Sequence, residues 1–302
     1  MIRFLKKRYV WAVLYGILLS AFTLYVVLDT FVLARVYMAV PEEAESGQSA
    51  DPPVQSTDSG TRIGSYSDGR IEITVTEYRI HDTSVYVADI LLSSADYLKT
   101  ALAGNVYGRN VTDKTSSIAE SHDAILAING DYYGARQSGY CLRGGVLYRD
   151  TASGGQEDLV IYEDGSFEII MEDEIAASEL LSDGAVQILS FGPALVSGST
   201  IAVSEEDEVG KAMVSNPRTA IGIIDNLHYV FVVSDGRTSE SEGLTLYELA
   251  VFLQELGASC AYNLDGSGSS TMYFNGEVIN QPTTNGRSIR ERSVSDIVYI
   301  GY

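Results

Sequence analysis

The chain contains, near its start, a stretch of twenty residues without a charged side chain, from Tyr9 to Leu28. An apolar helix of about twenty residues is long enough to cross the hydrocarbon core of a bilayer. A helix in the core of a soluble protein rarely lacks a polar face over such a length. Because the apolar character continues past Asp29 to Tyr37, the stretch predicts a transmembrane anchor over residues 9–37.

The charges on either side of this anchor predict its orientation. Four basic residues precede it within residues 1–8, and an acidic segment, residues 41–45, follows it. Basic residues that flank a membrane helix stay on the cytoplasmic side. We therefore expect a cytoplasmic basic tail over residues 1–8 and an extracytoplasmic domain held at the cell membrane. A cleaved signal peptide is the alternative, although its apolar region would be long and no A-x-A sequence closes it.

The composition changes again after the anchor. Residues 41–68 are rich in Ser, Gly, Pro, Asp and Glu, which predicts a flexible stalk, and residues 69–302 read as one domain. The whole chain carries a net charge of −21, and residues 1–40 hold five basic residues and one acidic residue, so residues 41–302 carry −25. A body this acidic repels phosphate backbones, so nucleic acid is not an expected partner.

Strand patterns dominate the domain. The segments Arg70–Ile80 and Ser84–Leu92 alternate β-branched or aromatic residues with polar ones, as paired strands do. Three turn sequences lie between apolar runs and predict hairpins: Asp164-Gly165, Asp225-Asn226 and Asn275-Gly276.

Only one helix of the domain is strongly marked. Thr245 and Glu248 form a T-x-x-E capping box, apolar residues follow at helical spacing, and Gly257 ends the pattern. Weaker helical patterns cover Ser116–His122 and Ile175–Leu181. Many strands with few helices predict an α+β fold, a mixed β-sheet domain behind one transmembrane helix.

Polar residues gather where the expected strands end. Three of these strands finish on an aspartate beside a glycine, namely Asp131, Asp235 and Asp265. Arg237 follows Asp235 in the same segment, and Arg218 directly precedes another expected strand. One such pair is ordinary turn chemistry. Three carboxylates presented at the ends of rigid strands beside arginines favour a catalytic site.

These motifs, in this order, resemble the phosphodiester glycosidase family. The matching segments cover most of residues 120–300: AINGDYY (127–133), NPRTAIG (216–222), VVSDGR (232–237), GLTLYELA (243–250), NLDGSGSSTM (263–272) and NQPTTNGRSIRERSVSD (280–296). The resemblance implies a hydrolase that cleaves a sugar-1-phosphate diester in a cell-surface glycan, wall polymer or glycolipid, with bacterial relatives linked to exopolysaccharide. This chain departs from the family pattern at Ser267 and Asp131, where glycine is common.

The residue types suit that reaction. Hydrolysis at an anomeric carbon needs a carboxylate that stabilises or attacks the developing cation, often with a second as acid or base. We predict Asp265 as the central carboxylate, with Asp131 and Asp235 as its partners. Arginine holds a phosphodiester through two parallel hydrogen bonds, which predicts a clamp of Arg218, Arg237 and Arg292. The remaining predicted substrate-binding residues lie in the matching segments: Asn129, Asn263, Gly266, Ser269, Ser270, Thr271 and Glu291.

Other features leave alternatives open. His81, His122 and His228 lie in no catalytic motif, so serine–histidine catalysis is not expected. Cys141 and Cys260 are compatible with a disulfide that stiffens the site or with two free thiols. The expected chemistry requires no cofactor, although the acidic excess leaves room for a bound Ca²⁺ ion. The alternative function is a non-catalytic protein that binds anionic glycans or assists exopolysaccharide export.

Overall fold

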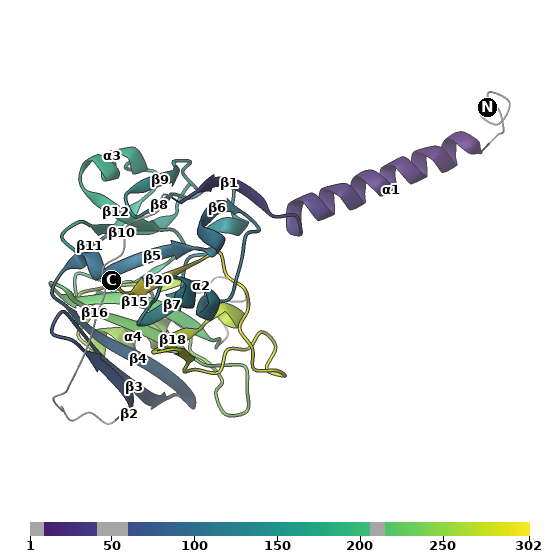
Figure 1. Ribbon diagram of the computed structural model, residues 1–302. Coiled ribbons are helices and arrows are strands. Elements are labelled where there is room, and N and C mark those ends of the chain that lie inside the picture. The colour runs from purple at the N-terminus through teal and green to yellow at the C-terminus, as the bar shows by residue number, and fades with distance from the viewer. Residues whose placement is uncertain (1–8, 41–59, 206–214) are drawn as a thin grey trace.

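The structure is a computed structural model that describes residues 9–40, 60–205 and 215–302. Helix α1 (Val10–Phe31) extends away from a body built of strands (Figure 1). The helix is shorter than the anchor predicted for residues 9–37, because the chain leaves it after Phe31 and forms strand β1 (Arg35–Ala39). This strand pairs with β6 (Val106–Arg109) at the edge of the body.

The stalk prediction is wrong in its last part, and residues 41–59 of that stalk lie outside the described residues. Strand β2 (Thr61–Ser67) pairs along its length with β3 (Ile71–Ile80). Tyr66 packs against the main core and donates to the Asp68 carboxylate at 2.8 Å. The backbone of this polar segment therefore completes a sheet, which its composition alone did not indicate.

The described strands form three larger sheets, antiparallel in every pairing. The eight-stranded sheet has the order β14-β13-β17-β15-β16-β4-β3-β2 and adds β4 (Thr83–Leu92), β13 (Ala194–Ser197), β14 (Thr200–Ile201), β15 (Arg218–Asp225), β16 (His228–Ser234) and β17 (Cys260–Leu264). A five-stranded sheet, order β19-β18-β7-β20-β5, contains β5 (Leu98–Leu102), β7 (Leu126–Asn129), β18 (Met272–Phe274), β19 (Glu277–Val278) and β20 (Asp296–Ile300). Another, order β11-β10-β12-β8-β9, contains β8 (Cys141–Arg143), β9 (Val146–Arg149), β10 (Glu157–Tyr162), β11 (Phe167–Met171) and β12 (Ala185–Leu189).

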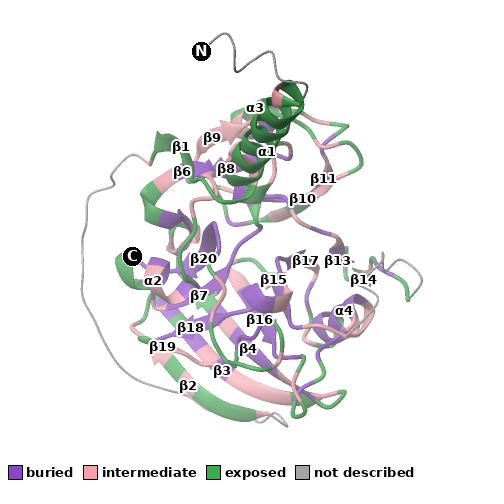
Figure 2. Ribbon diagram, turned by 90° about the vertical axis from the view of Figure 1, so that its right-hand side faces the viewer, coloured by how far each residue is buried: buried purple, intermediate pink, exposed green. Residues whose placement is uncertain are grey.

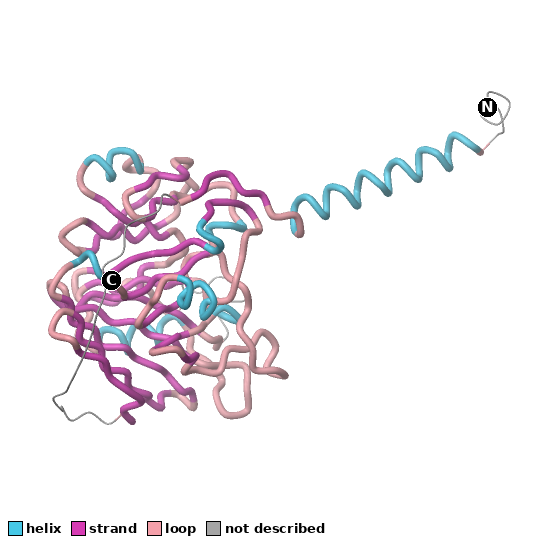
Figure 3. The backbone as a smooth tube through the Cα atoms, in the orientation of Figure 1, coloured by secondary structure: helices cyan, strands magenta, loops and turns pink. Residues whose placement is uncertain are grey.

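Three short helices cover these sheets, and with them the α+β prediction is confirmed (Figure 3). They are α2 (Thr115–Ser121), α3 (Ala177–Ser182) and α4 (Leu246–Glu255). Helix α2 packs on the sheet of β7 and β20, α3 on the sheet of β12, and α4 on the eight-stranded sheet.

Strand β16 shows how the layers are held together. Tyr229, Phe231 and Val233 point into the core shared with the sheet of β7, whereas Val230 and Val232 point to the opposite core under α4. Both faces of the strand are buried (Figure 2). Burial on both faces explains why its sequence is an unbroken apolar run instead of an alternating one.

The predicted local signals for turns and helices are confirmed. All three predicted turns join antiparallel hairpin strands, β10–β11, β15–β16 and β18–β19. In α4, Thr245 Oγ1 accepts from the Glu248 amide at 3.1 Å, and the Glu248 carboxylate accepts from the Thr245 amide at 2.8 Å. Gly257 adopts a φ of +90°, the left-handed conformation expected beyond a helix end.

Candidate active site

Strand register brings the predicted motifs together where three neighbouring strands of the eight-stranded sheet, β15, β16 and β17, begin or end. Arg218, the first residue of β15, is opposite Ser234, the last of β16, and Thr219 is opposite Leu264, the last of β17. Antiparallel neighbours begin where their partners end. The segments that carry Arg218, Asp235 and Asp265 therefore lie side by side.

Asn129, the last residue of β7, connects the five-stranded sheet of β7 to these strand ends. Its Nδ2 donates to the Asp265 carbonyl at 2.5 Å, and its Oδ1 accepts from Thr219 Oγ1 at 2.8 Å and from the Thr271 amide at 3.2 Å. The side chain is fully buried. The structure therefore uses Asn129 to fix the backbone around Asp265.

The Asp265 carboxylate is the centre of the candidate site. Its Oδ2 accepts from Ser269 Oγ at 2.6 Å and from Arg292 Nη2 at 2.8 Å. Arg292 also donates to Ser269 Oγ through Nε at 2.9 Å and Nη2 at 2.6 Å. Burial raises the pKa of Asp265, and the charges of Arg292 and Arg136 with the Ser269 hydrogen bond oppose that rise. The side chain of Asp265 still keeps 12% of its surface exposed, and that of Arg292 keeps 37%.

The loop after Asp265 is folded tightly against residue 217. The Ser267 amide donates to the Pro217 carbonyl at 2.7 Å, and a Cβ added at Gly266 would lie 2.8 Å from the same oxygen. Ser267 has a φ of +64°, a conformation that favours glycine. This conformation suits the glycine that the family resemblance implies at this position, where this chain has serine. The 3₁₀ turn Ser267–Ser269 then returns Ser269 to the Asp265 carboxylate.

The three arginines of the predicted clamp have different surroundings. Arg237 is exposed, and it donates to Asn216 Oδ1 through Nε at 3.1 Å and through Nη2 at 2.9 Å. Burial of part of the group and the charge of Arg292 lower the pKa of Arg237, so Arg292 lies close enough to act on Arg237. Arg218 is buried, and its Nε donates to the Leu244 carbonyl at 2.8 Å. Arg237 and Arg292 therefore form the accessible cationic pair, whereas Arg218 belongs to the scaffold.

Asp235 lies in a separate hydrogen-bond group behind the loop. Its Oδ1 accepts from the Gln281 amide at 2.8 Å and from Asn280 Nδ2 at 3.1 Å, and its Oδ2 accepts from the Tyr86 hydroxyl at 3.4 Å. Burial raises the pKa of Asp235. Because Asn280 also donates to the Ser270 carbonyl at 3.0 Å, this group holds the loop that follows Asp265.

Asp131 forms an enclosed ionic group with Arg143 and Asp296. Arg143 Nη2 lies 2.8 Å from Asp131 Oδ2 and 2.8 Å from Asp296 Oδ2. Asp131 also accepts from the amides of Ser190 at 2.7 Å and Tyr133 at 3.0 Å. The prediction that Asp131 presents its carboxylate at a strand end is wrong, because the residue is 0% exposed. Its interior position is stable because a cation and two amide donors surround it.

The other predicted substrate-binding residues divide into two groups. Asn263 Oδ1, Ser270 Oγ and Thr271 Oγ1 are buried and have no hydrogen-bond partner in the described part of the chain. Glu291 instead accepts from Ser116 at both carboxylate oxygens, at 2.9 Å from the amide and 2.6 Å from the hydroxyl. Glu291 thus fixes its loop to the first turn of α2.

Three charged residues of this region were not predicted. Arg136 lies near enough to act on the pKa of Asp265, and Arg143 and Asp296 complete the group of Asp131. A signal was present for the last two, since each is the one charged residue of an apolar strand segment, CLR and DIVYI. A lone charge in a buried strand requires a partner.

The structure also places the histidines, the cysteines and the possible metal ligands that the sequence left open. His228 lies 3.2 Å from Asp89, His81 lies 3.7 Å from Glu248, and His122 contacts the Ile118 carbonyl. The side-chain partners of Ser269 Oγ are instead Asp265 and Arg292. Both cysteines are free. Across residues 9–40, 60–205 and 215–302, no group of three or more His, Cys, Asp or Glu side chains is arranged to hold a metal ion.

Comparison with known proteins decides the family. The profile of the phosphodiester glycosidases matches residues 122–301, more than half of the chain. The chain belongs to the phosphodiester glycosidase family. Human N-acetylglucosamine-1-phosphodiester alpha-N-acetylglucosaminidase is 32% identical over 182 residues, 55% of this chain and 35% of the human protein. The uncharacterized SPbeta prophage protein YomE of Bacillus subtilis is 32% identical over 202 residues, 65% of this chain and 31% of YomE. This chain thus spans about a third of the length of these curated relatives.

Solved structures share the fold of this phosphodiester glycosidase family member. The catalytic domain of zebrafish N-acetylglucosamine-1-phosphodiester alpha-N-acetylglucosaminidase, auto-inhibited by its pro-peptide, matches with a TM-score of 0.61 and 18% identity over 90% of this chain and 89% of that chain. A hypothetical protein from Synechocystis matches with a TM-score of 0.55 and 14% identity over 76% of this chain and 62% of that chain. At these identities the likeness shows the fold alone.

Proposed function

We propose that this family member is a membrane-anchored, extracytoplasmic hydrolase that cleaves a sugar-1-phosphate diester in a cell-surface glycan, wall polymer or glycolipid. The observation that carries the proposal is the Asp265 carboxylate, which stays partly exposed while Ser269 and Arg292 hold it and Arg237 lies beside Arg292. This arrangement suits a substrate whose anomeric carbon carries a phosphodiester, because the two arginines can bind the phosphodiester while the carboxylate acts at the anomeric carbon.

In this mechanism, Arg237 and Arg292 bind the phosphodiester oxygens and Asp265 faces the anomeric carbon. Arg292 favours the ionised form of Asp265 and so keeps it ready to stabilise or attack an oxocarbenium-like centre. When the anomeric C–O bond breaks, the phosphate monoester of the acceptor leaves as a weakly basic anion and needs little help from a general acid. The placement of Asp131 and Asp235 in separate buried groups is compatible with a single reacting carboxylate.

The anchor is supported by the length and surface of α1. The helix has 22 residues, a mean hydropathy of 2.1 and no buried residue. At about 1.5 Å per residue its length is about 33 Å, close to the hydrocarbon thickness of about 30 Å. A signal sequence has the same character, and the state of the N-terminus in the mature protein separates the two. Mass spectrometry of the chain purified from membranes should find residues 9–31 intact.

The activity is tested with the purified full chain and a panel of α- and β-linked sugar-1-phosphodiesters, with release of the sugar as the readout. Alkyl glycosides of the same sugars, which lack the phosphate, are the matched controls. We expect release from at least one diester and none from the alkyl glycosides. Saturable binding of anionic glycans without release from any diester would instead support the non-catalytic alternative.

A further inference from the structure

Side chains of the domain hold the end of helix α1. Arg109 Nη2 donates to the carbonyls of Thr30 at 2.6 Å and Asp29 at 3.2 Å, and Asn110 Nδ2 donates to the Leu33 carbonyl at 3.1 Å. The last carbonyls of a helix have no partner inside it, and a cation there is also attracted by the helix dipole. The domain is therefore attached directly to the end of α1.

This attachment fixes the depth of the domain relative to the proposed membrane. The length of α1 matches the hydrocarbon core, so Arg109 at its end lies at the level of the lipid headgroups. The residues that follow the helix are apolar and exposed: Val32, Leu33, Val36, Tyr37 and Met38. Apolar and tyrosine side chains next to a spanning helix are typical of the membrane interface.

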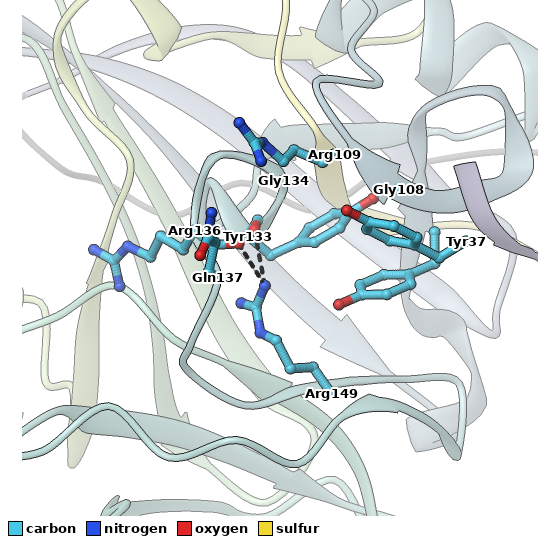
Figure 4. Close-up of a pocket in the computed structure, with 9 residues that line it drawn as sticks. Tyr37, Gly108, Arg109, Tyr133, Gly134, Arg136, Gln137 and Arg149 are labelled. Atoms are coloured by element: carbon cyan, nitrogen blue, oxygen red, sulfur yellow. Dashed lines mark hydrogen bonds between the residues drawn. The ribbon is translucent and has the colours of Figure 1, made fainter. Parts of the chain in front are cut away.

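A pocket of about 220 Å³ lies at this same level (Figure 4). Its lining comes from three strands and one loop: Tyr37 of β1, Tyr107, Gly108 and Arg109 of β6, Arg149 of β9, and Tyr133, Gly134, Arg136 and Gln137 of the loop after β7. The lining contains three arginines and no carboxylate. In a body that carries −25, this makes a local positive site.

Stacked tyrosine rings connect the pocket to strand β1, which follows the helix. The Tyr107 ring lies 5.8 Å from that of Tyr37 and stacks at 5.4 Å on that of Tyr133. Tyr133 is 1% exposed, and its hydroxyl has no hydrogen-bond partner of good geometry in the described residues. The Gly108 backbone also acts on the Tyr133 hydroxyl, so this buried polar group is only weakly satisfied by the protein.

Arg149 is oriented before any ligand arrives. Its Nη1 donates to the carbonyls of Arg136 at 2.9 Å and Tyr133 at 3.2 Å, as Figure 4 shows. Its buried Nη2 has no acceptor of good geometry in the described residues, although the Tyr107 hydroxyl interacts with the same guanidinium. A buried guanidinium nitrogen without an acceptor is costly, and an anionic oxygen would satisfy it.

We propose that this pocket binds the phosphate of an anionic lipid headgroup in the membrane that α1 spans. The inference rests on the proposed anchor and not on the proposed hydrolysis. The headgroup would fix the orientation of the domain over the bilayer, because the same residues that line the pocket also hold the helix end and pair with β1.

The test titrates the full chain, in nonionic detergent, with short-chain phosphatidylglycerol and follows the Tm of the domain. Inorganic phosphate and short-chain phosphatidylcholine are titrated in parallel. We expect a saturable rise in Tm with phosphatidylglycerol and a weaker effect of both other ligands. Equal stabilisation by inorganic phosphate would overturn the lipid assignment.

Matched variants locate the binding. Gln137→Glu adds a carboxylate at the exposed pocket rim, and Gln254→Glu makes the same charge change in α4, away from the pocket. We expect Gln137→Glu and Arg149→Gln to weaken phosphatidylglycerol binding about tenfold, by about 1.4 kcal/mol, and Gln254→Glu to leave it unchanged. Unaltered binding in Gln137→Glu, whose exposed position spares the fold, overturns the pocket as the site.

The anchor is measured separately by alkaline carbonate extraction of membranes. A chain that resists extraction but shows no saturable phosphatidylglycerol effect overturns the headgroup site and leaves the proposed function standing. A chain that is released overturns the anchor and the headgroup site together. Sugar release is not part of either readout.

Discussion

Replacing Arg143 with methionine should destabilise the domain strongly. Arg143 is 4% exposed, and its Nη2 lies 2.8 Å from a carboxylate oxygen of both Asp131 and Asp296. Methionine fills a similar volume but leaves two buried carboxylates without their cation. Removing one partner of a buried ionic group costs about 3–5 kcal/mol. At roughly 2–4 °C per kcal/mol for a domain of this size, the Tm should fall by about 6–20 °C.

The pH dependence of this loss has a defined sign. Burial and the Asp131 charge raise the pKa of Asp296 from 3.8 to about 7, against the effect of Arg143. Between these values the folded chain holds a proton that the unfolded chain has lost, so this group stabilises the fold at low pH and the stability is lost as pH rises towards 7. Without Arg143 the pKa rises further, so the variant should be closest to the wild type near pH 5 and furthest near pH 8.

Calorimetry of the full chain in detergent at both pH values measures the effect. Arg62→Met removes an exposed arginine of β2 and serves as the control. The triple variant Arg143→Met, Asp131→Asn, Asp296→Asn removes all three charges and should recover most of the lost Tm. A loss under 2 °C in Arg143→Met, or a loss that is the same at pH 5 and pH 8, would refute the reasoning.

Three further predictions concern the site and the fold. Arg237→Ala should raise KM for a phosphodiester about tenfold with an unchanged Tm, whereas Arg218→Ala should lower the Tm, because only Arg218 is buried. Steady-state kinetics and calorimetry on both variants measure these effects. The reverse pattern would contradict the placement of Arg237 in the site and of Arg218 in the scaffold. Because burial raises the pKa of Asp265, kcat should fall on acidification at a pH above 3.8, the usual value; a pH–rate profile that is flat down to pH 4 opposes this. Thr245→Ala should cost about 1 kcal/mol of unfolding free energy in denaturant titration through loss of the α4 cap, and no change would mean that the capping box is not a stabilising contact.

Local signals made much of the fold predictable. The capping box of α4 and the hairpin turn at Asp225-Asn226 depend on residues three or fewer positions apart, and the structure contains both. The carboxylate and arginine of the centre, Asp265 and Arg292, lie in two matching segments of the family, so their meeting was expected from the resemblance.

Long-range contacts were not predictable in this way. Arg143 and Asp296 are 153 positions apart, and nothing near either residue indicates the other. Strand β1 has the composition of the anchor, yet it leaves the helix because β6 offers a backbone partner. Asp131 and Asp265 both lie just beyond the end of a strand, and only the surrounding donors show that Asp131 is enclosed while Asp265 faces a partly open site.

The central claim is that the Asp265 carboxylate performs the reaction, and the most direct test compares Asp265→Asn with Asp164→Asn. Both aspartates precede a glycine and accept hydrogen bonds from a serine, but Asp164 lies in an exposed hairpin turn. Asparagine keeps the shape of the side chain and removes its charge. With kcat on a cleaved phosphodiester and Tm measured on the same samples, Asp265→Asn should lose about 1,000-fold in kcat, about 4 kcal/mol, and keep its fold, while Asp164→Asn keeps full activity. Near-normal turnover in a folded Asp265→Asn variant would contradict the account.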